Sequence, residues 1–136
     1  MKDKRTILLI DDDKDDLMLI KHTIREVNDS YLLHEAENGN VAMEYLNNAL
    51  KTGHLPCLIV LDINMPVLNG KQFLDIIRKD NTFAKIPIVV LTTSANSEDI
   101  NFCNKYNVEM LTKPFKMKLL FETVKKILLH CPSAES

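Results

Sequence analysis

Short apolar runs alternate with amphipathic segments along the whole chain. The runs, each about the length of a β-strand, are Thr6 to Ile10, Tyr31 to Ala36, Cys57 to Leu61, Ile86 to Leu91 and Val108 to Leu111. Between them apolar residues recur at intervals of three and four, which is typical of helices with one buried face. These residues are Leu17, Ile20, Ile24 and Val27, then Ala42, Tyr45, Leu46 and Ala49, then Phe73, Leu74 and Ile77, and finally Leu120, Val124, Ile127 and Leu128.

A fifth helix, from Ser97 to Tyr106, is predicted mainly from the residues at its N-terminus rather than from the periodicity of its apolar residues. Ser97 is a suitable N-cap, and Glu98 and Asp99 would lie in the first turn, where acidic residues are favoured. Five strand–helix units with nearly continuous apolar strands predict an α/β fold, in which a parallel sheet is covered by helices on both faces. In such a doubly wound sheet ligands bind beyond the carboxyl ends of the strands. The residues that follow each strand are therefore the candidates for chemistry.

Length and composition place the chain among globular proteins and exclude several other classes. We expect one domain spanning residues 1–136, with a core from about 5 to 130 and a short tail at 131–136. The net charge is −2, without a run of lysine or arginine, so direct DNA binding is not expected. The chain has neither an apolar stretch that could span a membrane nor a signal-peptide core, which predicts a cytoplasmic protein.

The cysteines and histidines do not form a recognisable metal motif. Cys57, Cys103 and Cys131 are odd in number, widely spaced and without a CxxC pair, so we interpret them as reduced, structural thiols. The four histidines are equally scattered, and none stands at metal-ligand spacing from another histidine or a cysteine.

A dense acidic cluster follows the first predicted strand. Five of the six residues from Asp11 to Asp16 are aspartates. Asp13 as an N-cap, with Asp15 and Asp16 in the first turn of a helix, accounts for three of them. It leaves Asp11 and Asp12, which end an apolar strand and should point into the crevice. Two carboxylates about 4 Å apart repel each other by roughly 1 to 4 kcal/mol, so a group of them indicates a bound cation.

Three further polar residues follow other strands. Asp62 comes after the third, Thr92 after the fourth and Lys113 after the fifth. Each has an ordinary structural interpretation, since Asp62 could cap the next helix, Thr92 could belong to a capping loop and Lys113 could be solvated. Brought together by the fold, Asp62 would complete a set of carboxylates suited to Mg²⁺, and a carboxylate can also act as a nucleophile toward phosphorus. Lys113 could neutralise the aspartates and bind a phosphoryl oxygen.

Together these motifs resemble the receiver domain of two-component response regulators, over essentially Arg5 to Leu129. The resemblance rests on segments in the same order as in that family, namely Ile10-Asp11-Asp12-Asp13, Glu35-Ala36-Glu37-Asn38-Gly39, Leu61-Asp62-Ile63-Asn64-Met65-Pro66 with Gly70, Leu91-Thr92-Thr93 and Thr112-Lys113-Pro114-Phe115. It implies the flavodoxin-like, CheY-like fold, with five parallel strands in the order 2-1-3-4-5.

The resemblance also implies a role for each site residue. Asp62 would be the phosphoacceptor, with a sensor histidine kinase phosphohistidine as donor. The residues that would hold Mg²⁺ are Asp12 and Asp62 directly, Asn64 through its backbone carbonyl, and Asp11 mainly through a water molecule. Thr92 would donate its hydroxyl and Lys113 its ammonium to the phosphoryl group, and the Lys113–Pro114 bond would be cis. Such a domain is not an enzyme with an external substrate, since it catalyses only its own phosphorylation and dephosphorylation.

The sequence departs from the family pattern at two positions. Met110 stands where the family usually has the aromatic residue that reports phosphorylation, and Thr93 stands where a small residue is common, which predicts tighter access to the phosphate. The segment Asn47 to Pro56 is longer than in many chemotaxis receivers, and it is similar to that of the stand-alone regulators that serve phytochrome-type sensor kinases.

We expect the output to pass through the face formed by Ser97 to Tyr106, Val108 to Leu111 and Lys116 to His130, which would support a homodimer or a partner contact. Val108 to Leu111 should be the edge strand. The main alternative to an output switch is a phosphorelay intermediate that passes the phosphoryl group to a histidine phosphotransfer protein. A receiver that acts unphosphorylated as a scaffold accounts poorly for the intact set of site residues.

Two other functional classes fit less well. A phosphatase of the haloacid dehalogenase type needs a second aspartate where Asn64 stands. A flavodoxin-like electron carrier needs a hydroxyl-rich phosphate loop where the aspartates lie.

Overall fold

The computed structural model describes residues 5–63, 70–93, 96–114 and 116–131. Its centre is a five-stranded sheet in the order β2-β1-β3-β4-β5, and every pair of neighbouring strands is parallel. The strands are β1 (Thr6–Ile10), β2 (Leu32–Ala36), β3 (Leu58–Leu61), β4 (Ile88–Thr92) and β5 (Glu109–Thr112). The predicted fold class and strand order are therefore confirmed, and β5 lies at an edge of the sheet as expected.

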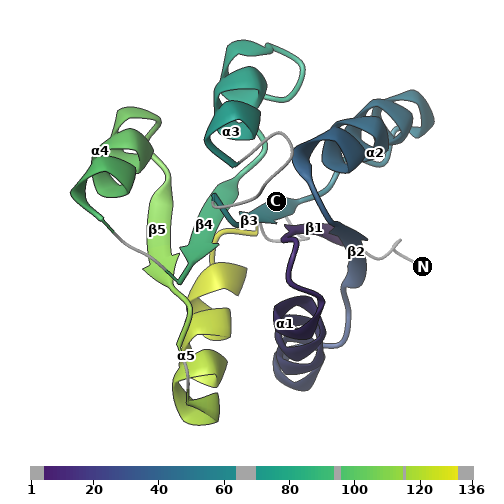
Figure 1. Ribbon diagram of the computed structural model, residues 1–136. Coiled ribbons are helices and arrows are strands. Elements are labelled where there is room, and N and C mark those ends of the chain that lie inside the picture. The colour runs from purple at the N-terminus through teal and green to yellow at the C-terminus, as the bar shows by residue number, and fades with distance from the viewer. Residues whose placement is uncertain (1–4, 64–69, 94–95, 115, 132–136) are drawn as a thin grey trace.

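Five helices cover both faces of this sheet. They are α1 (Lys14–Val27), α2 (Gly39–Thr52), α3 (Gly70–Lys79), α4 (Ser97–Lys105) and α5 (Met117–Leu128). Helices α2, α3 and α4 lie on one face, and α1 and α5 lie on the other (Figure 1). Because each crossover returns the chain to the same end of the sheet, all five strand exits open on one edge of the molecule.

Strands β2, β3 and β5 begin one residue later than the apolar pattern predicts, and β4 begins two residues later. Pro87 lacks an N–H and precedes β4, although its carbonyl still accepts a hydrogen bond from the Ile59 N–H at 2.9 Å. At its other end β4 extends to Thr92, which pairs with Thr112 of β5 and is the last residue of the strand rather than the first one after it.

The helix starts confirm one predicted cap and correct another. The Asp13 side chain accepts hydrogen bonds from the backbone N–H groups of Asp15 and Asp16, as expected of the N-cap of α1. In α4 the cap is Asn96, whose side chain accepts from the Asp99 N–H, and Ser97 is already helical. Asparagine caps as well as serine does, so the predicted boundary was wrong by one residue.

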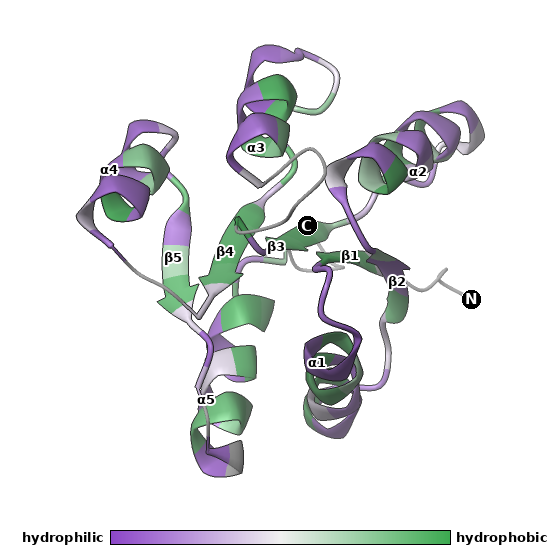
Figure 2. Cartoon of the chain, in the orientation of Figure 1, coloured by the Kyte–Doolittle hydropathy of each residue, from purple (hydrophilic) through white to green (hydrophobic). Residues whose placement is uncertain are grey.

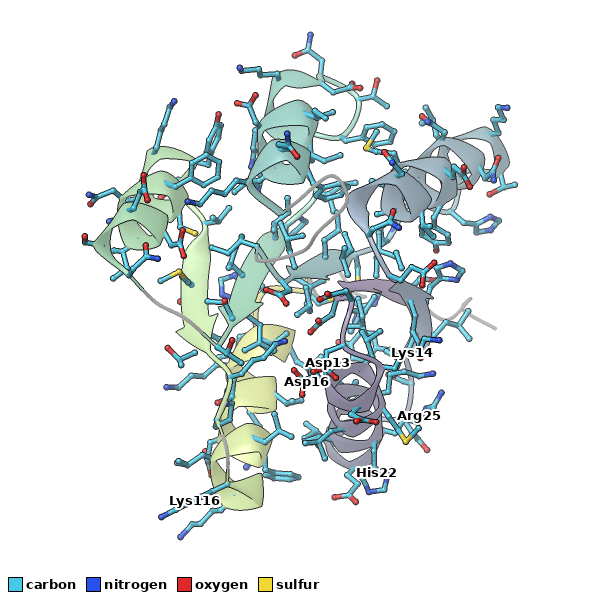
Figure 3. All side chains as sticks on the ribbon, in the orientation of Figure 1. Asp13, Lys14, Asp16, His22, Arg25 and Lys116 are labelled. Atoms are coloured by element: carbon cyan, nitrogen blue, oxygen red, sulfur yellow. A yellow bond between two sulfur atoms is a disulfide. The ribbon has the colours of Figure 1, made fainter. Side chains whose placement is uncertain are left out.

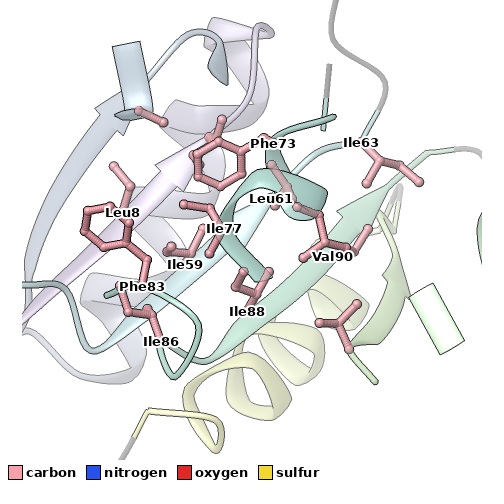
Figure 4. Packing of buried hydrophobic residues seen from close by; sticks show 14 of the residues in the cluster. Leu8, Ile59, Leu61, Ile63, Phe73, Ile77, Phe83, Ile86, Ile88 and Val90 are labelled. Atoms are coloured by element: carbon pink, nitrogen blue, oxygen red, sulfur yellow. The ribbon is translucent and has the colours of Figure 1, made fainter. Parts of the chain in front are cut away.

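The core consists of two apolar layers, one on each face of the sheet. Alternate residues of the central strands point to opposite faces, so that Leu8 and Ile59 lie in the layer under α2 and α3, whereas Ile7 and Val60 lie under α1 and α5. Figure 4 shows Phe73 and Ile77 of α3 packed with Phe83 over the strands. In Figure 2 the central strands are coloured as hydrophobic, and hydrophilic colour gathers on the outer sides of the helices.

Two of the three cysteines are not reduced thiols, and that prediction was wrong. Cys57 and Cys131 form a disulfide, with their Cα atoms 5.5 Å apart, whereas Cys103 is free and buried. Because the two partners are separated by 74 positions, their spacing gave no sign of a pair. Cys57 precedes β3 and Cys131 follows α5, and the crossovers bring these two points together beneath the α1/α5 layer.

No helix in the described part of the chain is both long and apolar enough to cross a membrane.

Candidate functional site

Three polar side chains stand at the carboxyl ends of three strands, two of which are neighbours in the sheet. Asp11 follows β1, Asp62 follows β3 and Lys113 follows β5. Their backbone N–H groups continue the sheet ladder, since Asp11 donates to the Ala36 carbonyl at 3.0 Å, Asp62 to Ile10 at 2.9 Å and Lys113 to Thr92 at 2.7 Å. The sheet therefore holds the backbone of all three residues in place independently of their side-chain contacts.

Asp11, Asp12 and Asp62 form a compact group of carboxylates. One oxygen from each lies within 4.8 Å of the others. Asp11 and Asp62 are 3% and 8% exposed, whereas Asp12 is exposed to solvent. A cleft of about 490 Å³ opens above them, and Asp12, Asp62 and Lys113 are among its lining residues. The group is thus half-buried and accessible from one side.

This donor set fits a hard divalent cation. All three side chains offer carboxylate oxygens, which Mg²⁺ binds through one or two carboxylates together with water and phosphate oxygens. The three carboxylates repel one another in a partly buried position, so binding of a cation would relieve this repulsion. The fourth predicted ligand, the backbone carbonyl of Asn64, lies outside the described residues.

Lys113 lies between three carboxylates. Its ammonium is 2.5 Å from an Asp11 oxygen, 2.9 Å from Asp16 and 3.5 Å from Asp62. Burial alone would lower the pKa of Lys113, but the hydrogen bonds to Asp11 and Asp16 outweigh burial and raise that pKa above its usual value. Lys113 therefore stays charged and partly neutralises the acidic group.

Asp11 is the carboxylate whose protonation is most affected by the fold. Burial raises its pKa to about 6, against the lowering effect of Lys113 and of the Asp13 N–H that donates to it at 3.0 Å. The fold therefore moves the protonation of Asp11 closer to neutral pH.

The two threonines at the end of β4 differ in exposure. Thr92 is completely buried, and Thr93 is exposed and lines the cleft. Thr93 therefore lies where its side chain faces the cleft, and its predicted effect on access to the phosphate stays a prediction. Ser94 lies outside the described residues.

Gly70 supports the Asp62 loop by its lack of a side chain. A Cβ atom at Gly70 would come within 2.5 Å of the Asp62 carbonyl oxygen, and it would also overlap the backbone of Ile63. The start of α3 is therefore packed directly against the backbone of Asp62. Only glycine permits this approach.

The structure also departs from the predicted site. Asp16, interpreted from the sequence as a helix-dipole residue, pairs with Lys113 across 97 positions. Asp16 lies in the first turn of α1, shortly after the end of β1, and this closeness to the strand ends is the signal that could have identified it. The expected cis bond at Lys113–Pro114 is absent, because every peptide bond among the described residues is trans. Trans is the lower-energy form of an X–Pro bond, and nothing in the described backbone imposes the other.

Helix α4 is attached to α3 by two polar contacts. The Lys71 ammonium lies 2.6 Å from the buried carboxylate of Asp99, and the Tyr106 hydroxyl donates to Asp75. Met110 of β5 is partly buried and packs against the core layer on the same face. Asp99, Tyr106 and Met110 belong to the face that the sequence predicts as the output surface, whereas Lys71 and Asp75 lie on α3 outside it.

Comparison with known proteins identifies the family. The sequence model of one protein family, the response regulator receiver domain, matches residues 7–125 of this chain. Response regulator Rcp1 of Synechocystis sp. is 32% identical over 126 residues, which cover 90% of this chain and 86% of Rcp1. Chemotaxis protein CheY1 of Helicobacter pylori is 31% identical, with 90% of this chain and 95% of that protein covered.

Solved structures agree with this assignment. The phosphorylated cyanobacterial phytochrome response regulator RcpA superposes with a TM-score of 0.84 at 32% identity, and 93% of each chain is covered. The Mn²⁺-bound form of Rcp1 gives a TM-score of 0.81 at 32% identity, and 91% of each chain is covered.

Proposed function

Since the chain belongs to the response regulator receiver family, we propose that it is a stand-alone phosphorylatable switch with Asp62 as the phosphoacceptor. The observation that carries this proposal is the meeting of Asp11, Asp62 and Lys113 at the ends of three strands, with a solvent-accessible cleft above them. Receiver domains take their phosphoryl group from sensor histidine kinases, so the donor we propose is a kinase phosphohistidine.

In the proposed reaction a carboxylate oxygen of Asp62 forms a bond to phosphorus. The bond between phosphorus and the histidine nitrogen breaks, and its electron pair leaves with the imidazole. Lys113 binds a phosphoryl oxygen through its ammonium, and Thr92 donates its hydroxyl to another. The contribution of the protein is positioning and charge neutralisation, as in phosphoryl transfer generally.

The cation we propose is Mg²⁺, held by Asp12 and Asp62 directly, by Asp11 mainly through water, and by the Asn64 backbone carbonyl. When bound it supplies charge neutralisation for the incoming phosphoryl oxygens. The oxygen-only donor set supports this choice. The Mn²⁺-bound form of the similar protein Rcp1 shows that a receiver of this type binds a divalent cation.

We propose that the output passes through protein contacts of α4, β5 and α5, by homodimerisation or by binding a downstream protein, without DNA contact. Transmission needs an element with two arrangements that the phosphoryl group biases. Met110 is flexible and partly buried on β5, and it can fill space opened when Thr92 moves toward the phosphoryl group. On this proposal residues 1–136 work as one domain that catalyses only its own phosphorylation and dephosphorylation.

A phosphorelay intermediate is the second candidate. It uses the same site residues but transfers the phosphoryl group onward to a histidine phosphotransfer protein. Incubation of the phosphorylated chain with such a protein separates the two, because only a relay intermediate loses its label to the added histidine.

Intact-mass measurement after incubation with acetyl phosphate tests the proposed acceptor. Wild type should gain one phosphoryl group with Mg²⁺ present and none after chelation. Asp62→Asn should gain none in either buffer. Equal labelling of Asp62→Asn would remove Asp62 as the acceptor, and labelling that survives chelation would remove the cation from the account.

A further inference from the structure

Asp16 competes with the proposed acceptor site for the same lysine. Its carboxylate lies 2.9 Å from the Lys113 ammonium, nearer than the Asp62 carboxylate at 3.5 Å. Asp16 projects from the N-terminal end of α1, where it is labelled beside Asp13 in Figure 3. The ammonium therefore lies nearer to Asp11 and Asp16 than to Asp62, the proposed acceptor.

The backbone of Asp16 is held independently of this contact. Its N–H donates to the Asp13 side chain at 3.1 Å, which is the N-terminal cap of α1. The Asp16 side chain is about one-third exposed and reaches the rim of the cleft, where it meets the lysine. The N-cap holds the backbone of Asp16 in the helix. The ion pair with Lys113 is what orients its carboxylate.

Asp15 is a natural comparison for Asp16. It is the preceding residue of the same turn, carries the same charge and donates its own N–H to the same Asp13 oxygen at 3.0 Å. Asp15 is exposed and is not among the three carboxylates that contact Lys113. The two aspartates thus differ in their contact with the lysine and share their role in the helix.

We propose that Asp16 is a positioning residue that holds the Lys113 ammonium toward α1 and so slows the phosphorylation of Asp62. This inference rests on the proposed function. An incoming phosphoryl group is an anion that needs the ammonium, and Lys113 must give up or share its contact with Asp16 to reach it. Asp16 also adds one negative charge beside the path of that anion.

The experiment measures the rate at which acetyl phosphate labels wild type, Asp16→Asn, Asp16→Glu and Asp15→Asn, by intact mass, with Mg²⁺ saturating for each variant. Asp16→Asn should be labelled about threefold to fivefold faster, which is the size expected for loss of one partly exposed ion pair. Asp15→Asn should stay within about twofold of wild type, because it removes the same charge without changing the lysine contact. Asp16→Glu should restore the wild-type rate, because its carboxylate can still reach the ammonium.

A second readout follows the lysine itself. The NMR signal of the Lys113 ammonium in Mg²⁺-free buffer should shift in Asp16→Asn and stay in place in Asp15→Asn. A change in helix stability alone would not produce that difference. The thermal midpoints of the two variants, measured alongside, should agree within a few degrees.

The outcomes separate the two proposals. If wild type is not labelled, or Asp62→Asn is labelled equally, the proposed function fails. If wild type is labelled but Asp16→Asn reacts at the wild-type rate, or no faster than Asp15→Asn, the positioning role of Asp16 is overturned and the proposed function stands.

Discussion

The two ends of the sheet are built from opposite kinds of residue. At the carboxyl end, the carboxylates of Asp11, Asp12 and Asp62 lie close together beneath an open cleft, and the buried Lys113 contacts two of them, Asp11 and Asp62. At the amino end, the Cys57 N–H bonds to the first residue of β1, and Cys57 is joined by a disulfide to Cys131 under an apolar layer. One end gathers like charges, and the other closes the fold covalently.

This difference indicates where stability and function reside in the molecule. Like charges at close range destabilise the folded state unless a cation or an ammonium compensates them. A disulfide stabilises the fold mainly by restricting the unfolded chain, and it does so whatever happens at the other end. We therefore expect changes at the amino end to alter unfolding without altering phosphorylation, and changes at the carboxyl end to alter both.

Loss of the disulfide should have the largest effect on stability. Cys131→Ser should lower the free energy of unfolding by about 4 kcal/mol, because the bridge spans 74 positions. Denaturant unfolding without reductant measures this loss. Labelling by acetyl phosphate should remain within about twofold of wild type, since the site lies at the other end of the sheet.

Reductant provides the control for that prediction. It should destabilise wild type by a similar amount and leave Cys131→Ser unchanged. If reductant weakens both proteins equally, or if wild type and variant unfold alike without reductant, the disulfide does not stabilise this fold.

Gly70→Ala should have the next largest effect, at the carboxyl end. The new methyl group would overlap backbone atoms of Asp62 and Ile63, which should cost about 2 kcal/mol and slow labelling of Asp62. Gly53→Ala is the matched control at the amino end. Gly53 has a φ of 76° and open space around it, so alanine there should cost about 1 kcal/mol and leave labelling unchanged. Equal labelling of both variants would contradict the close packing of α3 on the acceptor loop.

Acidification should weaken the binding of Mg²⁺ at the carboxyl end. Burial raises the pKa of Asp11 to about 6, so Asp11 is largely ionised at pH 7 and largely protonated at pH 5. The proton excludes the cation, and apparent Mg²⁺ affinity should fall about tenfold over this interval. Calorimetric titration at both pH values measures it. Asp11→Asn should lack this step, and its persistence there would assign the titrating group elsewhere.

Removal of the Asp12 carboxylate should have the smallest effect on stability. It should raise the stability of the folded state, whereas the substitutions of Cys131 and Gly70 lower it. Asp12→Asn relieves repulsion among the carboxylates, so its thermal midpoint in Mg²⁺-free buffer should rise by a few degrees. Added Mg²⁺ should reduce the gain, because the cation stabilises wild type more than the variant. Thermal unfolding in the two buffers measures this, and a lower midpoint of the variant in both would contradict it.

The sequence predicted the sheet well because the three central strands, β1, β3 and β4, are almost entirely apolar and the crossovers leave little choice of topology. It also predicted that Asp11, Asp62 and Lys113 would meet, since parallel strand ends share one edge. It did not predict the contact of Asp16 with Lys113 or the pairing of Cys57 with Cys131. Both join points far apart in the chain, and their partners depend on how helices pack rather than on local pattern.

The smaller errors have local causes. The N-cap of α4 is Asn96 rather than the predicted Ser97. The two are adjacent and both residue types are good N-caps, so the sequence did not distinguish them. The Lys113–Pro114 bond was expected to be cis from the family resemblance alone and is trans here.

The central claim is that a group bound at Asp62 changes the edge of the sheet formed by α4 and β5. Backbone NMR shifts with and without beryllofluoride in the presence of Mg²⁺ test it most directly, with Asp62→Asn as control. The account predicts shifts around Asp12, Asp62 and Lys113 and also across Ile100 to Met110, all absent in Asp62→Asn. Shifts confined to the loops around the site would contradict a switch through this face and favour the relay.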